Sequence, residues 1–173
     1  HIKKFAVNPF GVNSLVAYDE TKECIVIDPG YSTDEEKQML QSFIENEQLK
    51  VVKLVNTHCH IDHILGNRFI CDTYQVKLHA HAEDQYNIDS SSQTAMMYGL
   101  PEPNSPDIDV FLNEGDTIDF GSSKLKILLT PGHTKGHICL YADQEKFAIC
   151  GDVLFQGSIG RTDLPGGDYD TLI

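Results

Sequence analysis

The sequence contains no long apolar run. No stretch approaches the roughly 20 consecutive apolar residues that a helix needs to cross a bilayer. The chain begins His1-Ile2-Lys3-Lys4-Phe5, without the apolar segment of a secretory signal peptide. These absences predict a cytoplasmic protein without a membrane partner.

Basic residues are scarce. The chain carries 13 Lys and Arg against 26 Asp and Glu, which gives a formal net charge of -13 at pH 7. Binding to nucleic acid needs a basic surface that neutralises phosphates, and this composition cannot easily supply one. The sequence therefore predicts no nucleic-acid partner and leaves part of its acidity free to face cations.

The chain also lacks a Cys-x-x-Cys pair. Its five cysteines are odd in number and lie in or beside apolar segments, which is typical of buried thiols in a reducing compartment. Cys59 lies between two histidines. Because side chains alternate along an extended segment, we expect Cys59 to point away from those histidines and to pack in the core.

Linkers, low-complexity tracts and close repeats are absent. With 173 residues, of which 40% are hydrophobic, the chain is long enough to bury one core, so we expect one domain over residues 1–173. Apolar segments bounded by turn residues outnumber amphipathic ones. This pattern predicts an α/β fold in which strands outnumber helices.

The segment boundaries follow from apolar spacing and turn residues. Strands are predicted at residues 14–18, 24–28, 51–55, 76–80, 116–120, 125–129, 137–141 and 147–150. Helices are predicted from 34 to 44, behind a Ser-Thr-Asp cap, and from 68 to 74. Residues 83–109 have the composition of loops or short helices and predict a functional lid. Residues 166–173 are typical of a helix cap and first turn, so the chain is expected to be cut short at its C-terminus.

A dense group of metal-binding side chains follows the strand predicted at 51–55. His58, His60, Asp62 and His63 fall within six residues. Imidazole nitrogens and carboxylate oxygens suit a cation such as zinc. Four such groups this close along the chain can hardly all reach one ion, so some are expected to hold a second ion or to support the ligands.

Three further polar signals follow apolar strands, at Thr130–His133, Cys150–Asp152 and Gly157–Arg161. His133 can add a third imidazole to the first ion. Asp152 has two oxygens and can bridge two ions. Water between two such ions has a lowered pKa and becomes a nucleophile at neutral pH, so the residues predict hydrolysis.

These motifs resemble a known family. The run His58-x-His60-x-Asp62-His63, followed by Pro131–His137 and Gly151–Phe155, is similar to the metallo-β-lactamase superfamily. The spacing, together with Gly157–Asp168, is similar to its glyoxalase II-like branch. The resemblance implies an α/β fold, a four-layer αββα sandwich that is apparently truncated at its C-terminus. It further implies metals at one edge of that sandwich and hydrolysis of a small-molecule thioester.

The resemblance also implies a division of the ligands. It assigns His58, His60 and His133 to the first metal, and Asp62 and His63 to the second. Asp152 would bridge the two ions, and Asp62 and Asp152 would be the catalytic carboxylates. Two zinc ions per chain are expected in the full-length protein, with iron or manganese as alternatives. The family's last histidine and its glutathione-contacting region have no counterpart here, so the second site is expected to be incomplete.

Other histidines receive supporting roles. His137 lies four residues after His133 and enters a strand, which favours orientation of a ligand or packing over direct ligation. His79 and His81 lie at the end of a separate strand without an Asp-His continuation, which favours an ordinary structural or surface role.

Substrate contacts are less defined. Arg161 is a candidate substrate-binding residue that could orient an anion through its planar guanidinium, and an ion pair with Asp163 or Asp168 is the equal alternative. Met96, Met97 and Tyr98 could line a pocket, but we expect them to pack the long loop down onto the protein.

The leading functional hypothesis is a metal-dependent hydrolase that acts on thioesters through a metal-bound hydroxide. A mononuclear iron persulfide dioxygenase that uses His58, His133 and Asp152 is one alternative. A non-catalytic metal-binding domain is the other. Hydrolysis of β-lactams is the weakest hypothesis, because nothing in the sequence indicates a secreted, disulfide-permissive protein. The sequence leaves the acyl group, the carrier thiol and the oligomeric state open.

Overall fold

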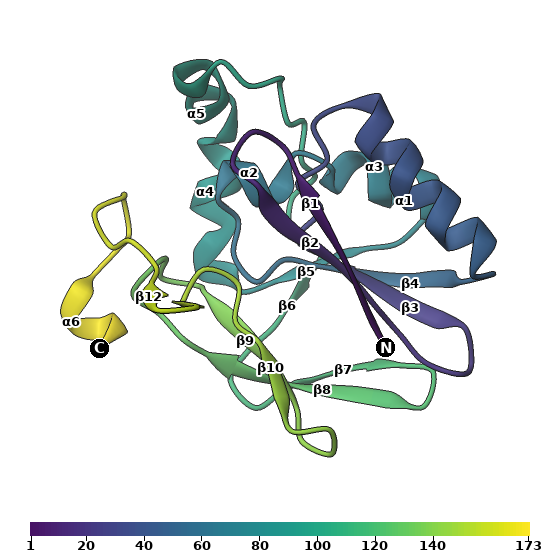
Figure 1. Cartoon of the computed structure of the whole chain (residues 1–173). Coiled ribbons are helices and arrows are strands. Elements are labelled where there is room, and N and C mark those ends of the chain that lie inside the picture. Colours follow the sequence, from purple (N-terminus) through teal and green to yellow (C-terminus); the bar gives the residue numbers. More distant parts are fainter.

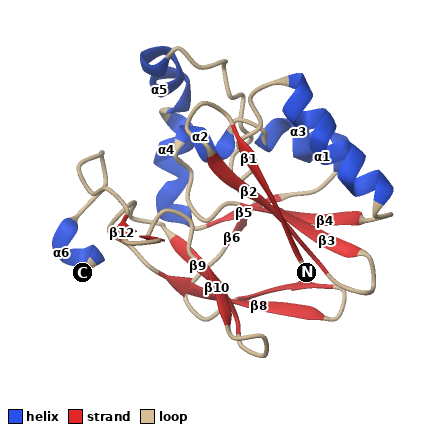
Figure 2. Cartoon of the chain, viewed as in Figure 1, coloured by secondary structure: helices blue, strands red, loops and turns tan.

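Two β-sheets pack face to face in the computed structural model, which describes all 173 residues. The helices between Asp34 and Tyr98 lie on one side of the larger sheet, and the smaller sheet lies on the other side (Figures 1 and 2). The predicted sandwich of two β-sheets with flanking helices is confirmed. The chain ends in α6 (Tyr169–Leu172), which lies at one end of the sandwich, and the Asp168 amide before it donates to the Gly132 carbonyl (2.8 Å).

The larger sheet has six strands in the order β1-β2-β3-β4-β5-β6. They are β1 (Ile2–Val7), β2 (Val12–Tyr18), β3 (Glu23–Ile27), β4 (Lys50–Val55), β5 (Leu78–Ala80) and β6 (Val110–Phe111). The first three are antiparallel, and β3 to β6 are parallel. Parallel strands have their carboxyl ends at one edge, so the segments that follow β4 and β5 meet there.

The smaller sheet is an antiparallel meander in the order β10-β9-β8-β7. Its strands are β7 (Thr117–Phe120), β8 (Ser123–Leu129), β9 (Ile138–Ala142) and β10 (Phe147–Ile149), and a hairpin of β11 (Leu154–Phe155) and β12 (Ser158–Ile159) follows. Buried and exposed residues alternate along β7, as expected for a sheet with one face in the core and the other towards solvent.

The helices follow β3, β4 and β5. They are α1 (Asp34–Asn46), α2 (Ile61–Ile64), α3 (Asn67–Tyr74), the short 3-10 helix η1 (Ala82–Asp84), α4 (Gln85–Asp89) and α5 (Ser91–Tyr98). A capping box starts α1, in which the Thr33 hydroxyl accepts from the Glu36 amide and the Glu36 side chain accepts from the Thr33 amide. The predicted cap of this helix is therefore confirmed. None of the helices is long and apolar enough to span a membrane.

Two hydrophobic cores hold the layers together. One lies between the larger sheet and the helices, and the other lies between the two sheets. In β3, Val26 faces the helices while Ile25 and Ile27 face the smaller sheet, and all three are fully buried. The central strands are therefore rigid supports for the loops at their carboxyl ends.

Candidate metal centre

The predicted ligands lie at one edge of the sandwich, with His58, His60, His133 and Asp152 in three loops and Asp62 and His63 in α2. The first loop follows β4 and leads into α2, the second joins β8 to β9, and the third follows β10. The first two are joined directly, because the Ile138 amide donates to the Thr57 carbonyl (2.8 Å). The strand ends therefore bring together residues that are far apart in the sequence.

Three imidazoles form the first ligand group. His58, His60 and His133 each offer one ring nitrogen, and these nitrogens lie within 4.8 Å of one another. His60 Nδ1 is 2.9 Å from His133 Nε2. His58 Nε2 is buried and has no hydrogen-bond partner in the protein. An orphaned nitrogen facing two others fits a cation that all three would bind.

A second group lies beside the first. It joins His58 to His63 and Asp152, again with ligand atoms within 4.8 Å of one another. Asp152 Oδ1 is 3.4 Å from His63 Nε2, and its Oδ2 is 3.8 Å from His133 Nε2. Each oxygen of this carboxylate therefore faces a different imidazole, which is the disposition that a bridging ligand needs.

Asp62 lies at the margin of this second group. Its Oδ2 is 3.7 Å from His63 Nε2, and its side chain is 20% exposed. Burial raises the pKa of Asp62. All six predicted ligands are thus brought to one edge of the fold, although His58 belongs to both groups and Asp62 belongs to neither. Their assignment to particular ions stays a prediction.

The electrostatics favour neutral imidazoles in the first group. Burial lowers the pKa of His60 to about 3, and the rings of His133 and His63 add to the effect. Burial likewise lowers the pKa of His58 well below its usual range. Because a metal binds the unprotonated nitrogen, these side chains are held in the form that binds cations.

In the second group, neighbouring opposite charges favour the charged forms of His63 and Asp152. Burial opposes a charge on His63, yet Asp28 and Asp152 raise the pKa of this histidine well above its usual range. Burial likewise opposes charge on Asp152, yet His63 lowers the pKa of that carboxyl. The carboxylates at this end of the site would offset the charge of a cation.

Asp28 was not singled out in the sequence. Its Oδ1 accepts from the Thr57 amide (2.7 Å), its Oδ2 accepts from the Thr57 hydroxyl (2.6 Å), and Oδ2 lies 3.3 Å from His63 Nδ1. A carboxylate behind the imidazole fixes the orientation of the ring. Asp28 has a φ of +50, which is unusual for a residue other than glycine and is typical of strain at a functional site.

Backbone groups orient two further histidines. His133 Nδ1 lies 2.7 Å from the Arg161 carbonyl, and since a carbonyl only accepts, Nδ1 carries the proton and Nε2 is left for a cation. His137 Nε2 accepts from the Asp152 amide (3.1 Å), and its Nδ1 lies 3.0 Å from the Thr130 hydroxyl. Both nitrogens of His137 are therefore engaged by the protein, as a supporting role requires.

The side chain of Arg161 lies outside this group. Its guanidinium makes two bonds to the Asp163 carboxylate, of 2.7 and 2.8 Å, at the surface. The ion pair considered as an alternative for Arg161 is thus present, and the contact with the metal centre is through the backbone carbonyl. A role in substrate binding stays a prediction.

Other side chains follow or depart from expectation. Cys59 is fully buried, His79 Nδ1 lies 3.1 Å from the Leu54 carbonyl, and His81 accepts from an amide of η1.

The expectation that Met96 and Met97 pack down is wrong, because they are 83% and 76% exposed. Residues 83–98 form short helices and residues 99–109 form a loop, and α5 turns Ser91 and Ala95 inward, so the two methionines after Ala95 face solvent.

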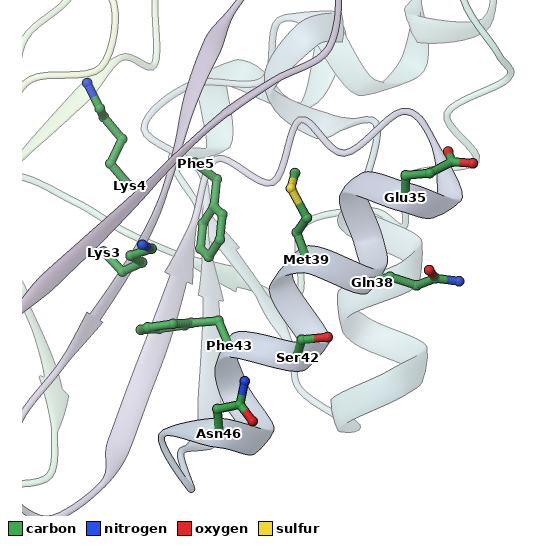
Figure 3. Close-up of a pocket in the computed structure, with 9 residues that line it drawn as sticks. All are labelled: Lys3, Lys4, Phe5, Glu35, Gln38, Met39, Ser42, Phe43 and Asn46. Carbon is green, nitrogen blue, oxygen red and sulfur yellow. The ribbon is translucent and has the colours of Figure 1, made fainter.

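Two of the hollows on the surface differ in their relation to the site. A cavity of about 350 Å³ lies beside His63 and Asp152, with the apolar side chains of Leu15, Leu154 and Phe155 in its wall. A more open groove of about 630 Å³ lies between β1 and α1 (Figure 3) and contains none of the predicted site residues. The first hollow therefore opens onto the candidate metal centre.

Comparison with known proteins decides the family. Residues 7–173 match the Metallo-beta-lactamase superfamily. The chain belongs to this superfamily. The predicted family is therefore confirmed, and the chain is a metallo-beta-lactamase superfamily member of hydrolase type.

Superfamily relatives cover nearly the whole chain. Hydroxyacylglutathione hydrolase GloC of Haemophilus influenzae is 36% identical over 180 residues, which span 100% of this chain and 81% of the relative. The crystal structure of BLEG-1 B3 metallo-beta-lactamase is 30% identical with a TM-score of 0.89, over 99% of this chain and 81% of that one. TTHA1623, solved in a di-iron-bound form, is 28% identical with a TM-score of 0.86, over 98% of this chain and 81% of that one.

Proposed function

We propose that this superfamily member is a dinuclear metal-dependent hydrolase of small-molecule thioesters. The observation that carries the proposal is the position of Asp152, whose two oxygens face His63 and His133 from the two ligand groups. A carboxylate in this position suits a two-metal centre, because it can hold both cations and offset their charge.

The residues divide into two sets. His58, His60 and His133 would hold the first cation, while His63 and Asp152, with Asp62 beside them, would hold the second. Bound divalent cations lower the pKa of coordinated water and polarise a substrate carbonyl. Zinc suits both sets of donors. The di-iron form of TTHA1623 makes iron the alternative to test.

The chain's own groups prepare the site for this chemistry. Asp28 Oδ2 lies within ion-pair distance of His63 Nδ1 (3.3 Å), and the Arg161 carbonyl accepts from His133 Nδ1. Asp62 is partly exposed and its pKa is raised by burial, so it is suited to accept a proton during turnover. Asp62 and Asp152 are therefore the carboxylates to which we assign catalytic roles.

The substrate class rests on the relatives. The identity with hydroxyacylglutathione hydrolase GloC supports a thioester substrate. The likeness to the B3 metallo-beta-lactamase BLEG-1 makes a β-lactam the second candidate. Both reactions add water to a carbonyl, so the geometry of the metal centre suits either, and a direct comparison of substrates decides between them.

The experiment compares turnover of zinc-loaded protein on a panel of hydroxyacylglutathione thioesters and on a chromogenic β-lactam. Thioester hydrolysis without oxygen consumption is expected. His60→Ala should lower kcat/KM by more than about 100-fold, since loss of a ligand exceeds the cost of losing an outer partner. His1→Ala, an exposed histidine outside the site, is the control.

Three results would count against the proposal. Turnover of the β-lactam alone would favour the second candidate. One iron per chain with oxygen consumption would favour a persulfide dioxygenase. If the wild-type protein binds zinc but turns over no substrate, a non-catalytic metal-binding domain would remain.

A further inference from the structure

A buried carboxylate outside the ligand set connects two of the loops that carry ligands. Asp84 ends η1, in the segment between β5 and α4, and it is 0% exposed. Its Oδ2 accepts from the Cys59 amide (2.7 Å), and its Oδ1 accepts from the Gly136 amide (3.0 Å). Asp84 belongs to neither ligand group.

The two amides belong to the two loops that carry the first ligand group. Cys59 lies between His58 and His60, so its backbone fixes where both imidazoles start. Gly136 lies three residues after His133, in the loop that joins β8 to β9. One side chain therefore binds the backbone of the loop with two ligands and the backbone of the loop with the third.

The fit around Asp84 is close. A Cβ atom on Gly136 would lie 2.8 Å from the Asp84 amide nitrogen and 2.9 Å from its Oδ1. Glycine is thus required for the second loop to approach η1. Both amides are buried, and a buried amide without an acceptor is costly, so each needs its own oxygen on Asp84.

We propose that Asp84 is a positioning residue that sets the separation of His58 and His60 from His133 by accepting one backbone amide from each loop. The inference rests on the proposed metal site. Three imidazoles that converge on one point need an external support to hold them there before a cation arrives, and supports of this kind set metal affinity. Asp84 supplies that support from a third segment of the chain.

The test is Asp84→Asn. An asparagine has the same shape but one acceptor oxygen, so its NH2 group would face one of the two amides. We expect zinc affinity, measured by competition with a chelator, to fall about 10- to 100-fold. The visible absorption spectrum of the Co²⁺-loaded protein should also change, because it reports the geometry of the ligands. Asp109→Asn is the matched control, since Asp109 Oδ2 accepts one amide at Leu78 (2.9 Å) away from the metal loops.

A second variant keeps the test decisive if Asp84→Asn does not fold. Gly136→Ala displaces the same contact from the other loop, so it should change the Co²⁺ spectrum and zinc affinity in the same direction. If both variants fold, the double variant should bind zinc no more weakly than the single variant that binds zinc less well. Both substitutions act on the same contact between Asp84 and the Gly136 amide, so their effects should not add.

Wild-type zinc affinity and Co²⁺ spectrum in the folded variants would overturn the proposal. So would a lower melting temperature of the metal-free protein with unchanged metal affinity, which is the result of a purely structural role. These readouts are independent of turnover. If the wild-type protein hydrolyses no thioester but Asp84→Asn weakens zinc, the proposed function fails while this inference stands.

Discussion

Two carboxylates outside the predicted ligand set, those of Asp28 and Asp84, support the candidate metal centre. Asp28 contacts Thr57 and His63, and Asp84 contacts the backbone at Cys59 and Gly136. The candidate ligands could be named from the sequence, because His58 to His63 lie within six residues and His133 and Asp152 each lie in a segment that directly follows a predicted strand. Asp28 and Asp84 could not, since each acts on a segment that only the folded sheets bring close.

Asp28→Asn tests the support of His63. The variant removes the charge beside Nδ1 while keeping the side-chain shape, so the second site should lose zinc affinity by about 10- to 100-fold and the first much less. Calorimetric titration with two-site fitting measures both. Asp19→Asn is the control, because Asp19 also accepts backbone amides but lies at the surface away from the histidines. Equal losses of zinc affinity at both sites would contradict the assignment of Asp28 as the support of His63.

The low pKa values of buried histidines predict acid sensitivity of the metal-free protein. The pKa of His60 and that of His137 are each about 3 in the fold. Unfolded histidine has a pKa of about 6.5, so between these values the unfolded chain binds protons that the folded chain does not. Stability is therefore complete above pH 6.5 and falls as the pH is lowered, by up to about 1.4 kcal/mol per pH unit for each such histidine.

Urea unfolding of chelator-treated protein at pH 6.5 and pH 5.5 measures this effect. His63 has a raised pKa, so its own contribution is complete below pH 6.5 and is lost as the pH rises through its folded pKa. His63 therefore does not alter the expected loss of stability between pH 6.5 and 5.5. His60→Gln cannot titrate and should reduce the slope. A stability that is flat or rises towards pH 5.5 would refute the burial of neutral imidazoles.

At the scale of elements, strands with continuous apolar runs were the most predictable. The runs at 24–28 and 51–55 correspond to β3 and β4, which are buried in the larger sheet. β1 was missed, because Lys3 and Lys4 interrupt its apolar pattern and only pairing with β2 defines it. β6, β11 and β12 have two residues each and carry too little pattern to be recognised.

The turn between β1 and β2 is tied to the metal centre through one asparagine. Asn8 Nδ2 donates to the carbonyls of Asp62 (2.8 Å) and Gly30 (2.9 Å), and the Asn8 amide donates to Glu36 (2.6 Å). Asn8 has a φ of +53, which asparagine tolerates better than most residues. The turn therefore fixes the start of α2, where Asp62 lies.

Asn8→Asp replaces the donor by an acceptor while keeping tolerance of this backbone conformation. The carboxylate would face two carbonyl oxygens, so the free energy of unfolding should fall by about 1–3 kcal/mol in urea titrations. Asn104→Asp is the matched control, because Asn104 also has a positive φ, of +45, but is exposed. Equal small effects of both variants would show that the turn does not depend on these bonds.

At the scale of the whole molecule, the sandwich brings loops of two sheets to one edge. The first loop follows β4 of the larger sheet, while the other two follow strands of the smaller sheet. The first ligand group therefore exists only when both sheets are packed, since His133 comes from a different sheet than His58 and His60. The family resemblance predicted this sandwich, while the supporting contacts across it required the structure.

The decisive measurement is the anomalous diffraction of crystals saturated with zinc. At saturating zinc we predict two peaks, one bound by His58, His60 and His133 and a weaker one beside His63 and Asp152, where the ligand set is expected to be incomplete, with the Asp152 carboxylate between them. A single ion, or zinc bound away from these histidines, would contradict the two-metal centre from which the proposed hydrolysis follows.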